Sequence, residues 1–348
     1  MIHLDAPAPG AGNAVDPVAQ VPFDSADSVD RTGSADSADS AHSADSADSA
    51  DSADLERRFG GLRRLYGRQG YARLRRSRVA VVGLGGVGSW AAEALARSGV
   101  AALVLIDLDH VAESNINRQV QALSSTLGAA KAQALRERIT QIHPACAVSA
   151  VEAFVDADNW PALLPHAVDV LIDACDQVRA KAVLVAWGLA SGVPVVCVGA
   201  AGGKQAAQRV EVEDLADVTH DPLLASLRQR LRKHGGARRT GKMGVMCVFS
   251  REPVMAPVRS PVNVPTTAPP TAPTMTPMAT TLALTRTTDT AEVAETGAGD
   301  GTLNCHGYGS SVTVTATFGM VAAGQAIASL LAHPVADPRE AQEKRDII

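Results

Sequence analysis

The chain has 348 residues, and 46% of them are hydrophobic, which is enough for a substantial core. Aromatic residues amount to 3%, which argues against stacking platforms for single-stranded nucleic acid. The net charge is −5, but residues 1–54 hold eleven Asp and one Arg and alone contribute −10. The rest of the chain therefore carries +5, and a uniformly acidic surface is excluded.

Two segments of biased composition divide the chain. Residues 1–54 carry a repeated Ser-Ala-Asp triplet with little apolar surface, which predicts a disordered tail; an acidic tether for a basic surface is the alternative. Residues 252–301 are rich in Pro and Thr and predict a loop or linker. The folded blocks are then 55–251 and 302–335, with a short tail at 336–348.

The five cysteines lie at positions 146, 175, 197, 247 and 305 and form no C-x-x-C pair. This spacing disfavours both a zinc ribbon and a disulfide framework. The N-terminus also lacks the basic and apolar regions of a secretory signal. We therefore expect a protein of the reducing cytoplasm.

Apolar runs alternate with helical patterns through the first folded block. Because the runs are apolar throughout, they predict the strands of a parallel, doubly wound α/β sheet of the Rossmann type. The predicted strands are 78–82, 102–106, 168–174 and 194–199, and the predicted helices are 87–98, 129–142 and 178–190.

Residues 312–332 contain no charged residue, and their length permits a membrane span. Thr313, Thr315 and Thr317 alternate as in a strand, and Gln325 interrupts the apolar remainder. A strand followed by a buried helix is therefore favoured over a span.

A glycine-rich loop follows the first strand and opens the first helix. It contains Gly83, Gly85, Gly86 and Gly88, which is G-x-G-x-x-G in the context that the motif requires. Glycines let the backbone approach a phosphate, and the helix N-terminus favours its negative charge. Asp107 ends the next strand, where a carboxylate can hold ribose hydroxyls. The pattern predicts a nucleotide site, with a turn that binds no ligand as the alternative.

The loop after Asp107 is polar and carries Asp109, Asn115 and Gln119. Arg118 and Lys131 place two cations near the glycine loop, and two cations suit a triphosphate better than a diphosphate bridge. The alternative is that these two side chains lie at ordinary solvated helix ends and bind no phosphate.

Asp176 follows the strand predicted at 168–174. A carboxylate beyond the carboxyl end of a parallel strand can hold Mg²⁺ beside the phosphates. Capping of the next helix is the alternative and does not exclude the first role.

Two segments are basic and contain no acidic residue. Residues 57–78 hold nine Arg, and residues 227–242 hold five Arg and two Lys. Such runs suit contact with an RNA phosphate backbone, and a solvated helix face is the alternative.

The chain resembles the ubiquitin-activating superfamily of ATP-dependent adenylating enzymes, the ThiF/MoeB/HesA group. The resemblance lies in five motifs that occur in this order: G-x-G-G-x-G-S, D-x-D, S-N-x-x-R-Q, a Lys and D-x-x-D. Residues 199–203, 221–223, 244–250 and 313–319 look like the branch of this superfamily that dehydrates threonylcarbamoyladenosine in tRNA. The resemblance spans residues 55–251 and 302–333.

The resemblance implies that ATP activates the threonine carboxylate as an acyl adenylate, that a ring closes within the same side chain, and that AMP and pyrophosphate leave. It implies that the four glycines form the nucleotide loop and that Asp107 binds ribose. It further implies that Asp176 binds Mg²⁺. The residues that it implies to contact the phosphates and the reacting carboxylate are Asp109, Asn115, Arg118, Gln119 and Lys131.

Further expectations also come from the resemblance. Cys247 lies where the family has a Cys; a catalytic thiol is one interpretation, and a small buried strand residue is favoured. Many members place an Arg of a partner subunit on the phosphates, but the nearest position here is Gly61, so Arg58 or Arg64 is the candidate. A homodimer, a monovalent cation, cysteine desulfurase sulfur-relay partners and membrane contact are the remaining expectations.

Three other functions compete with this interpretation. An activating enzyme for a small ubiquitin-like sulfur carrier protein shares the ATP site, but it often has two C-x-x-C pairs that this chain lacks. A nicotinamide-dependent dehydrogenase fits the glycine loop but not Arg118 and Lys131. A nucleotide-sensing module would bind ATP without turnover.

Overall fold

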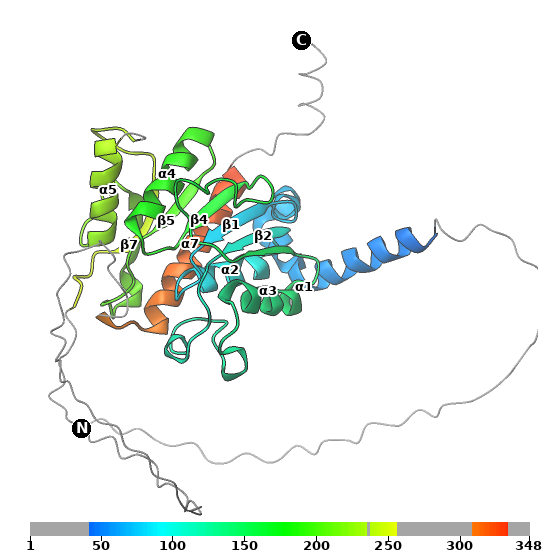
Figure 1. Cartoon of the computed structure of the whole chain (residues 1–348). Coiled ribbons are helices and arrows are strands. Elements are labelled where there is room, and N and C mark those ends of the chain that lie inside the picture. The colour runs from blue at the N-terminus through cyan, green and yellow to red at the C-terminus, as the bar shows by residue number, and fades with distance from the viewer. Residues whose placement is uncertain (1–41, 235–236, 256–307, 333–348) are drawn as a thin grey trace, which may run out of the picture. The chain divides into compact units, whose positions relative to one another are not determined.

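Seven strands form the central sheet of the computed structural model, which describes residues 42–234, 237–255 and 308–332 (Figure 1). The sheet order is β3-β2-β1-β4-β5-β7-β6, and every pair is parallel except β6–β7. The strands are β1 (Arg78–Val82), β2 (Ala102–Ile106), β3 (Ala147–Val151), β4 (Val170–Asp173), β5 (Val195–Val198), β6 (Val210–Asp214) and β7 (Met246–Ser250).

The chain order reverses between β1 and β4, so the carboxyl ends of these two strands open a crevice at a topological switch point. The predicted doubly wound α/β fold is confirmed, and the four strands predicted within residues 55–251 are present within two residues of their expected ends. Strands β3 and β6 are additional, because their half-exposed residues lack the continuous apolar pattern of a buried strand.

Helices cover both faces of the sheet because successive strand residues point to opposite sides. Val79 and Val81 belong to the core that α2, α3 and α7 share, whereas Ala80 and Val82 pack against α4. The helices are α1 (His42–Leu74), α2 (Gly88–Arg97), α3 (Lys131–Ile142), α4 (Val178–Ser191), α5 (Pro222–His234) and α7 (Val312–Ala332).

Helix α1 begins inside the segment that was predicted to be disordered. It starts at His42 and is interrupted at Gly67, whose φ is +71°. Asp54 accepts a hydrogen bond from the Arg58 Nε at 2.6 Å, four residues on, and such pairs favour a helix over a disordered chain. Residues 42–54 are therefore helical, while the rest of the predicted tail, most of the predicted linker and the tail at 336–348 lie outside the described residues.

Residues 312–332 form one helix, so the strand predicted around Thr313–Thr317 is wrong. The Thr317 hydroxyl donates to the Thr313 carbonyl at 2.7 Å, which satisfies it within a helix. Burial recurs every four residues along α7, at Val314, Phe318, Ala322, Ala326 and Leu330. This helical period runs the length of the segment and outweighs a short alternation of threonines.

The packing of α7 favours a buried helix over a membrane span. By length and mean hydropathy (1.5) α7 qualifies as a span, yet 56% of that window is buried inside the protein. Gly319 lies against α2, where a Cβ would come within 2.5 Å of the Val87 carbonyl oxygen. Small residues thus let two helices approach closely in the core, and membrane contact stays a prediction.

Residues 255 and 309, which stand on either side of the part of the chain that is not described, are both bonded to Gly203. The Met255 N–H donates to the Gly203 carbonyl at 2.9 Å, and the Gly203 N–H donates to the Gly309 carbonyl, also at 2.9 Å. The described residues on either side of 256–307 are therefore neighbours.

His143 follows α3 and is buried, with its ring 4.7 Å from that of Phe59 and its Nδ1 without a partner. Burial, with smaller contributions from Arg75 and Arg58, lowers the pKa of His143 to about 4. An unfolded His titrates near 6.5, so below that pH the unfolded chain takes up a proton that the folded protein does not. Stability from neutral His143 is therefore present above pH 6.5 and is lost as the pH falls toward 4.

We expect His143→Gln to remove this part of the acid destabilisation. Between pH 7 and pH 5, the loss of unfolding free energy should shrink by about 2 kcal/mol relative to the wild type. Urea denaturation at the two pH values measures it, with the exposed His234→Gln as the control. An equal loss in the wild type and in His143→Gln would contradict the assignment.

Candidate active site

A cavity of 290 Å³ opens at the switch point, beyond the carboxyl ends of β1 and β4. The glycine loop, the loop after β2, the turn after β4 and the first turn of α7 form its walls. It brings together the predicted residues Gly83, Gly85, Gly86, Asp107, Asp109, Asn115, Arg118, Gln119, Lys131 and Asp176.

Two glycines of the loop are required by close packing. Gly83 has a φ of +84°, and a Cβ there would lie 2.8 Å from the Ala174 carbonyl group. A Cβ on Gly88 would lie 1.8 Å from the Gly83 carbonyl oxygen. No side chain caps α2 and its first turn has no acidic residue, so this N-terminus is open to an anion.

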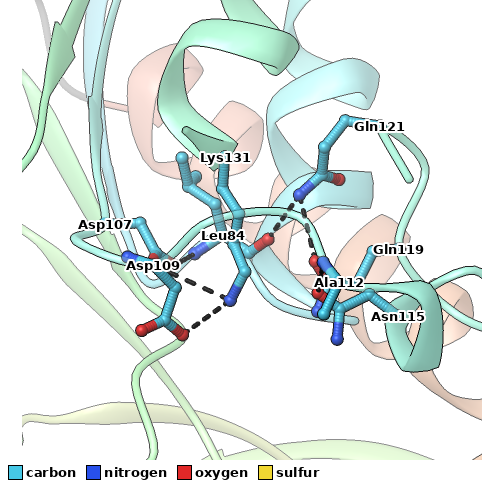
Figure 2. Close-up of polar contacts among 8 residues, drawn as sticks. All are labelled: Leu84, Asp107, Asp109, Ala112, Asn115, Gln119, Gln121 and Lys131. Atoms are coloured by element: carbon cyan, nitrogen blue, oxygen red, sulfur yellow. Dashed lines mark hydrogen bonds and ion pairs between the residues drawn. The ribbon is translucent and has the colours of Figure 1, made fainter. Parts of the chain in front are cut away.

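Asp107 and Lys131 form the polar centre of the site (Figure 2). The Leu84 N–H donates to Asp107 Oδ2 at 2.6 Å, which fixes the glycine loop against the end of β2. Lys131 Nζ lies 2.7 Å from Asp109 Oδ2 and 4.0 Å from Asp107 Oδ1. Burial raises the pKa of Asp107 above its ordinary value, although Lys131 and two backbone N–H groups partly offset this effect.

Arg118 presents a cation at the cavity edge. Its Nη1 donates to the Ser114 carbonyl at 2.7 Å and to Asn117 Oδ1 at 3.0 Å. The Arg118 carbonyl accepts a hydrogen bond from Trp90 Nε1 at 2.9 Å. Because these partners are neutral, the charge of the guanidinium is available to an anion.

Gln121 is a site residue that sequence analysis missed. Its Nε2 donates to the Leu84 carbonyl at 2.9 Å and to Gln119 Oε1 at 3.1 Å, as Figure 2 shows. Asn115 Oδ1 in turn accepts from the Ala112 N–H at 3.1 Å, which holds the turn before it. Gln121 thus links the glycine loop to Gln119, which lines the cavity. In the sequence, only its position two residues after Gln119 indicates that it belongs near the site.

Asp176 lines the cavity from the turn between β4 and α4. Among the described residues, no group of three or more His, Cys, Asp or Glu side chains is placed to hold a metal ion by itself. One carboxylate facing a phosphate site nevertheless fits Mg²⁺, which takes one or two carboxylates and completes its shell with phosphate oxygens and water.

The structure does not bring Cys247 to the cavity, so a catalytic thiol is not supported. Cys247 is fully buried on β7 in a cluster with Val185, Cys197 and Phe249. It therefore fits the favoured interpretation of a small buried strand residue.

Arg58 lies away from the cavity of its own chain. Its Nη1 donates to the carbonyl of Ile142, at the far end of α3 from Lys131. The length of that helix separates the two positions by about 16 Å. A role for Arg58 at this cavity is therefore not possible within one chain, and it stays a prediction for a second copy.

Comparison with known proteins agrees with this geometry. The model of the ThiF family matches residues 58–345. The chain is 39% identical over 278 residues to the tRNA threonylcarbamoyladenosine dehydratase of Escherichia coli (strain K12), which covers 79% of this chain and 94% of that enzyme. The crystal structure of the E. coli enzyme in complex with ATP has a TM-score of 0.63 at 38% identity and covers 80% of this chain and 95% of that chain.

A second relative from E. coli matches less of the chain. The molybdopterin-synthase adenylyltransferase of E. coli (strain K12) is 39% identical over 127 residues, which is 36% of this chain and 51% of that enzyme. The likeness to the dehydratase thus extends beyond the part shared with this adenylyltransferase.

We expect Gln121→Leu to weaken ATP binding by roughly tenfold, because the Leu84 carbonyl and Gln119 Oε1 lose their donor in a buried site. Calorimetric titration measures the affinity. Gln133→Leu makes the same change on the surface of α3 and should leave the affinity unchanged. Equal ATP affinities for Gln121→Leu and the wild type would contradict a positioning role.

Proposed function

Because the chain belongs to the ThiF family, we propose that it is an ATP-dependent tRNA threonylcarbamoyladenosine dehydratase. One observation carries the proposal: a single cavity gathers the glycine loop, Arg118, Lys131 and Asp176, in a chain that matches a dehydratase over nearly the whole length of that enzyme.

The reaction solves the problem that a carboxylate is a poor electrophile. The threonine carboxylate attacks the α-phosphorus of ATP, the bond to the bridging oxygen breaks, and pyrophosphate leaves. An atom of the same side chain then attacks the activated carbonyl, and AMP departs with one carboxylate oxygen. The nucleoside has lost one water, and the ring closes readily because both reacting groups belong to one side chain.

The chain contributes positioning and charge. The α2 N-terminus and Arg118 face developing negative charge on the phosphates, and Asp107 holds ribose hydroxyls. Lys131 pairs with Asp109 before ATP binds, so it is held at the site and exchanges a carboxylate for a phosphate oxygen.

Asp176 is the residue we assign to Mg²⁺, since it lines the cavity at the end of β4. When bound, the ion neutralises phosphate charge. Asp176 would also fix the position of the ion's positive charge relative to Arg118. The protein does not have to supply all the ligands of the ion for either of these two roles.

The tRNA surface we infer is α5 rather than the arginine-rich segment 57–78. Much of that segment is engaged within its own chain: Arg63 pairs with Glu56 at 2.8 Å, and Arg73 donates to the Leu330 and Leu331 carbonyls. Arg73 thus holds α1 against α7 and Arg63 pairs within α1, which argues against RNA contact at these two arginines.

Helix α5 connects the cavity to a basic surface. Leu223 in its first turn lines the cavity, and Asp221 accepts from the Leu224 N–H at 3.0 Å and from the Ala200 N–H at 2.9 Å. Further along, Arg230 and Lys233 are exposed, and a hollow is lined by Ala225, Arg228, Gln229, Arg232 and Lys233. An RNA whose modified base enters the cavity would meet these cations with its backbone.

A homodimer stays a prediction. It would bring Arg58 or Arg64 of a second copy to the phosphates, and light scattering in the presence of ATP tests it. Cytoplasmic location agrees with four free thiols among the described residues. A monovalent cation and sulfur-relay partners also stay predictions.

The dehydratase reaction is tested by one mass spectrum. After incubation with Mg-ATP, tRNA that bears threonylcarbamoyladenosine should yield a nucleoside lighter by one water, with AMP released. Asp176→Asn should lower AMP formation on the order of 100-fold, whereas ATP should still bind, roughly fivefold more weakly in Mg²⁺ than to the wild type. No mass shift, with ATP–pyrophosphate exchange only after a small carrier protein is added, would favour the carrier-activating alternative.

The tRNA surface predicts a salt effect. Arg230→Ala with Lys233→Ala should weaken tRNA binding and lower the slope of log Kd against log salt by about 1 to 2, because each phosphate contact releases counterions. ATP affinity should not change. The control is Arg64→Ala with Arg68→Ala, two exposed arginines of α1. If only the control pair changes the slope of log Kd against log salt, the tRNA-binding surface lies on α1 and not on α5.

A further inference from the structure

A buried ion pair lies directly behind the cavity wall, at the carboxyl end of β4. Asp173 is the last residue of β4 and Lys181 lies on α4; both side chains are fully buried. Lys181 Nζ is 3.2 Å from Asp173 Oδ1. Neither residue lines the cavity, and the chemistry derived above uses neither of them.

Two thiols complete the cluster. The Cys175 Sγ donates to Asp173 Oδ1 at 2.8 Å, and the Cys197 Sγ donates to Asp173 Oδ2 at 3.4 Å. Burial raises the pKa of Cys175, so its thiol keeps the proton that it donates. Burial also opposes the charged form of Lys181, but the combined interactions with Asp173 and the two cysteines outweigh it and raise the pKa of Lys181. The cluster therefore contains one cation and one anion, each surrounded by hydrogen-bonding groups.

The Lys181 side chain holds the start of the turn that carries Asp176. Its Nζ donates to the main-chain carbonyl of Asp173 at 3.2 Å, where the turn begins. The turn ends at Gln177, whose carbonyl accepts the ordinary backbone bond of the first turn of α4 from the Lys181 N–H at 3.0 Å. Within the turn, the Cys175 N–H donates to Asp173 Oδ1 at 3.3 Å.

The same turn touches the glycine loop. A Cβ on Gly83 would lie 2.8 Å from the carbonyl carbon and oxygen of Ala174 and from the Cys175 nitrogen. The Ala174 N–H donates to the Val82 carbonyl at 2.8 Å. A shift of this turn would therefore move Asp176 and press on the loop that faces the phosphates.

We propose that Lys181 is a positioning residue of the active site, which sets the conformation of the turn at residues 174–177 and thereby aims Asp176 at the metal-bound phosphates. The inference rests on the proposed role of Asp176 in the preceding section. It assigns Lys181 no contact with substrate.

The location of the pair points to this role rather than to stability alone. A buried ion pair contributes little net stability, because desolvation of the two charges offsets their attraction, and apolar residues often serve as well. Here the cation bonds the main chain of the turn as well as its ion-pair partner. Replacing both charged residues together leaves no unpaired charge in the core, so the protein should stay stable. Any change in ATP binding then reports the geometry of the turn rather than a loss of stability.

The experiment compares Lys181→Met, which leaves Asp173 buried without its partner, with the double variant Lys181→Met/Asp173→Asn, which is neutral and similar in volume. Lys181→Met should lower the melting midpoint by about 10 °C, and the double variant should recover most of that loss. Leu231→Ala, a core truncation in α5, is the stability-matched control.

The decisive readout is the ATP dissociation constant in EDTA divided by that in Mg²⁺, which needs neither tRNA nor turnover. In the double variant this ratio should fall roughly fivefold, toward the ratio of Asp176→Asn, because Asp176 no longer faces the metal. Leu231→Ala should keep the wild-type ratio.

A double variant that is stable and keeps the wild-type ratio would overturn the positioning role of Lys181. So would an equal fall in Leu231→Ala, which would show that lost stability alone is sufficient. If Mg²⁺ does not tighten ATP binding to the wild type, the role of Asp176 fails first, and the inference that rests on it fails with it.

Discussion

The close approach of the glycine loop to the turn after β4 is the constraint on which the site depends. Gly83 has no room for a side chain because the Ala174 carbonyl group fills that space. Gly88 has no room for one because the Gly83 carbonyl oxygen occupies the position that a Cβ would take. This packing sets the N-terminus of α2 beside the turn that carries Asp176, at the point where the strand order reverses. Parallel strands alone would open a crevice there; the glycines decide how near the two walls come.

Three buried or mostly buried carboxylates hold the walls in the same manner, each through a backbone N–H of a cavity-lining turn or the adjoining loop. Asp107 accepts from Leu84, Asp173 from Cys175, and Asp221 from Ala200. The arrangement places carboxylates at three of the segments that surround the cavity. Three cations answer it: Lys131, Arg118 and Lys181, of which Lys181 faces inward to Asp173. Lys131 and Arg118 line the cavity, whereas Lys181 neutralises a carboxylate behind it.

What could be predicted from the sequence was local. The glycine motif, the apolar strands and Asp107 follow from spacing within about thirty residues, and the fold confirms the strands they imply. Features that depend on a distant partner could not be derived. The threonines of α7 alternate like a strand, and only packing against α2 shows a helix. Gln121 and Lys181 look like ordinary polar residues until Leu84 and Asp173 are placed beside them.

Both boundaries of the undescribed stretch at residues 256–307 are tied to Gly203, one through its carbonyl and one through its N–H. The described residues at the two ends of this stretch therefore lie at adjacent points of the domain. The entropy of closing such a chain grows with the logarithm of its length, so doubling it costs about 0.6 kcal/mol. A change in the number of residues between these two points therefore changes the closure entropy little, and α7 keeps its place against α2 because its own contacts hold it there.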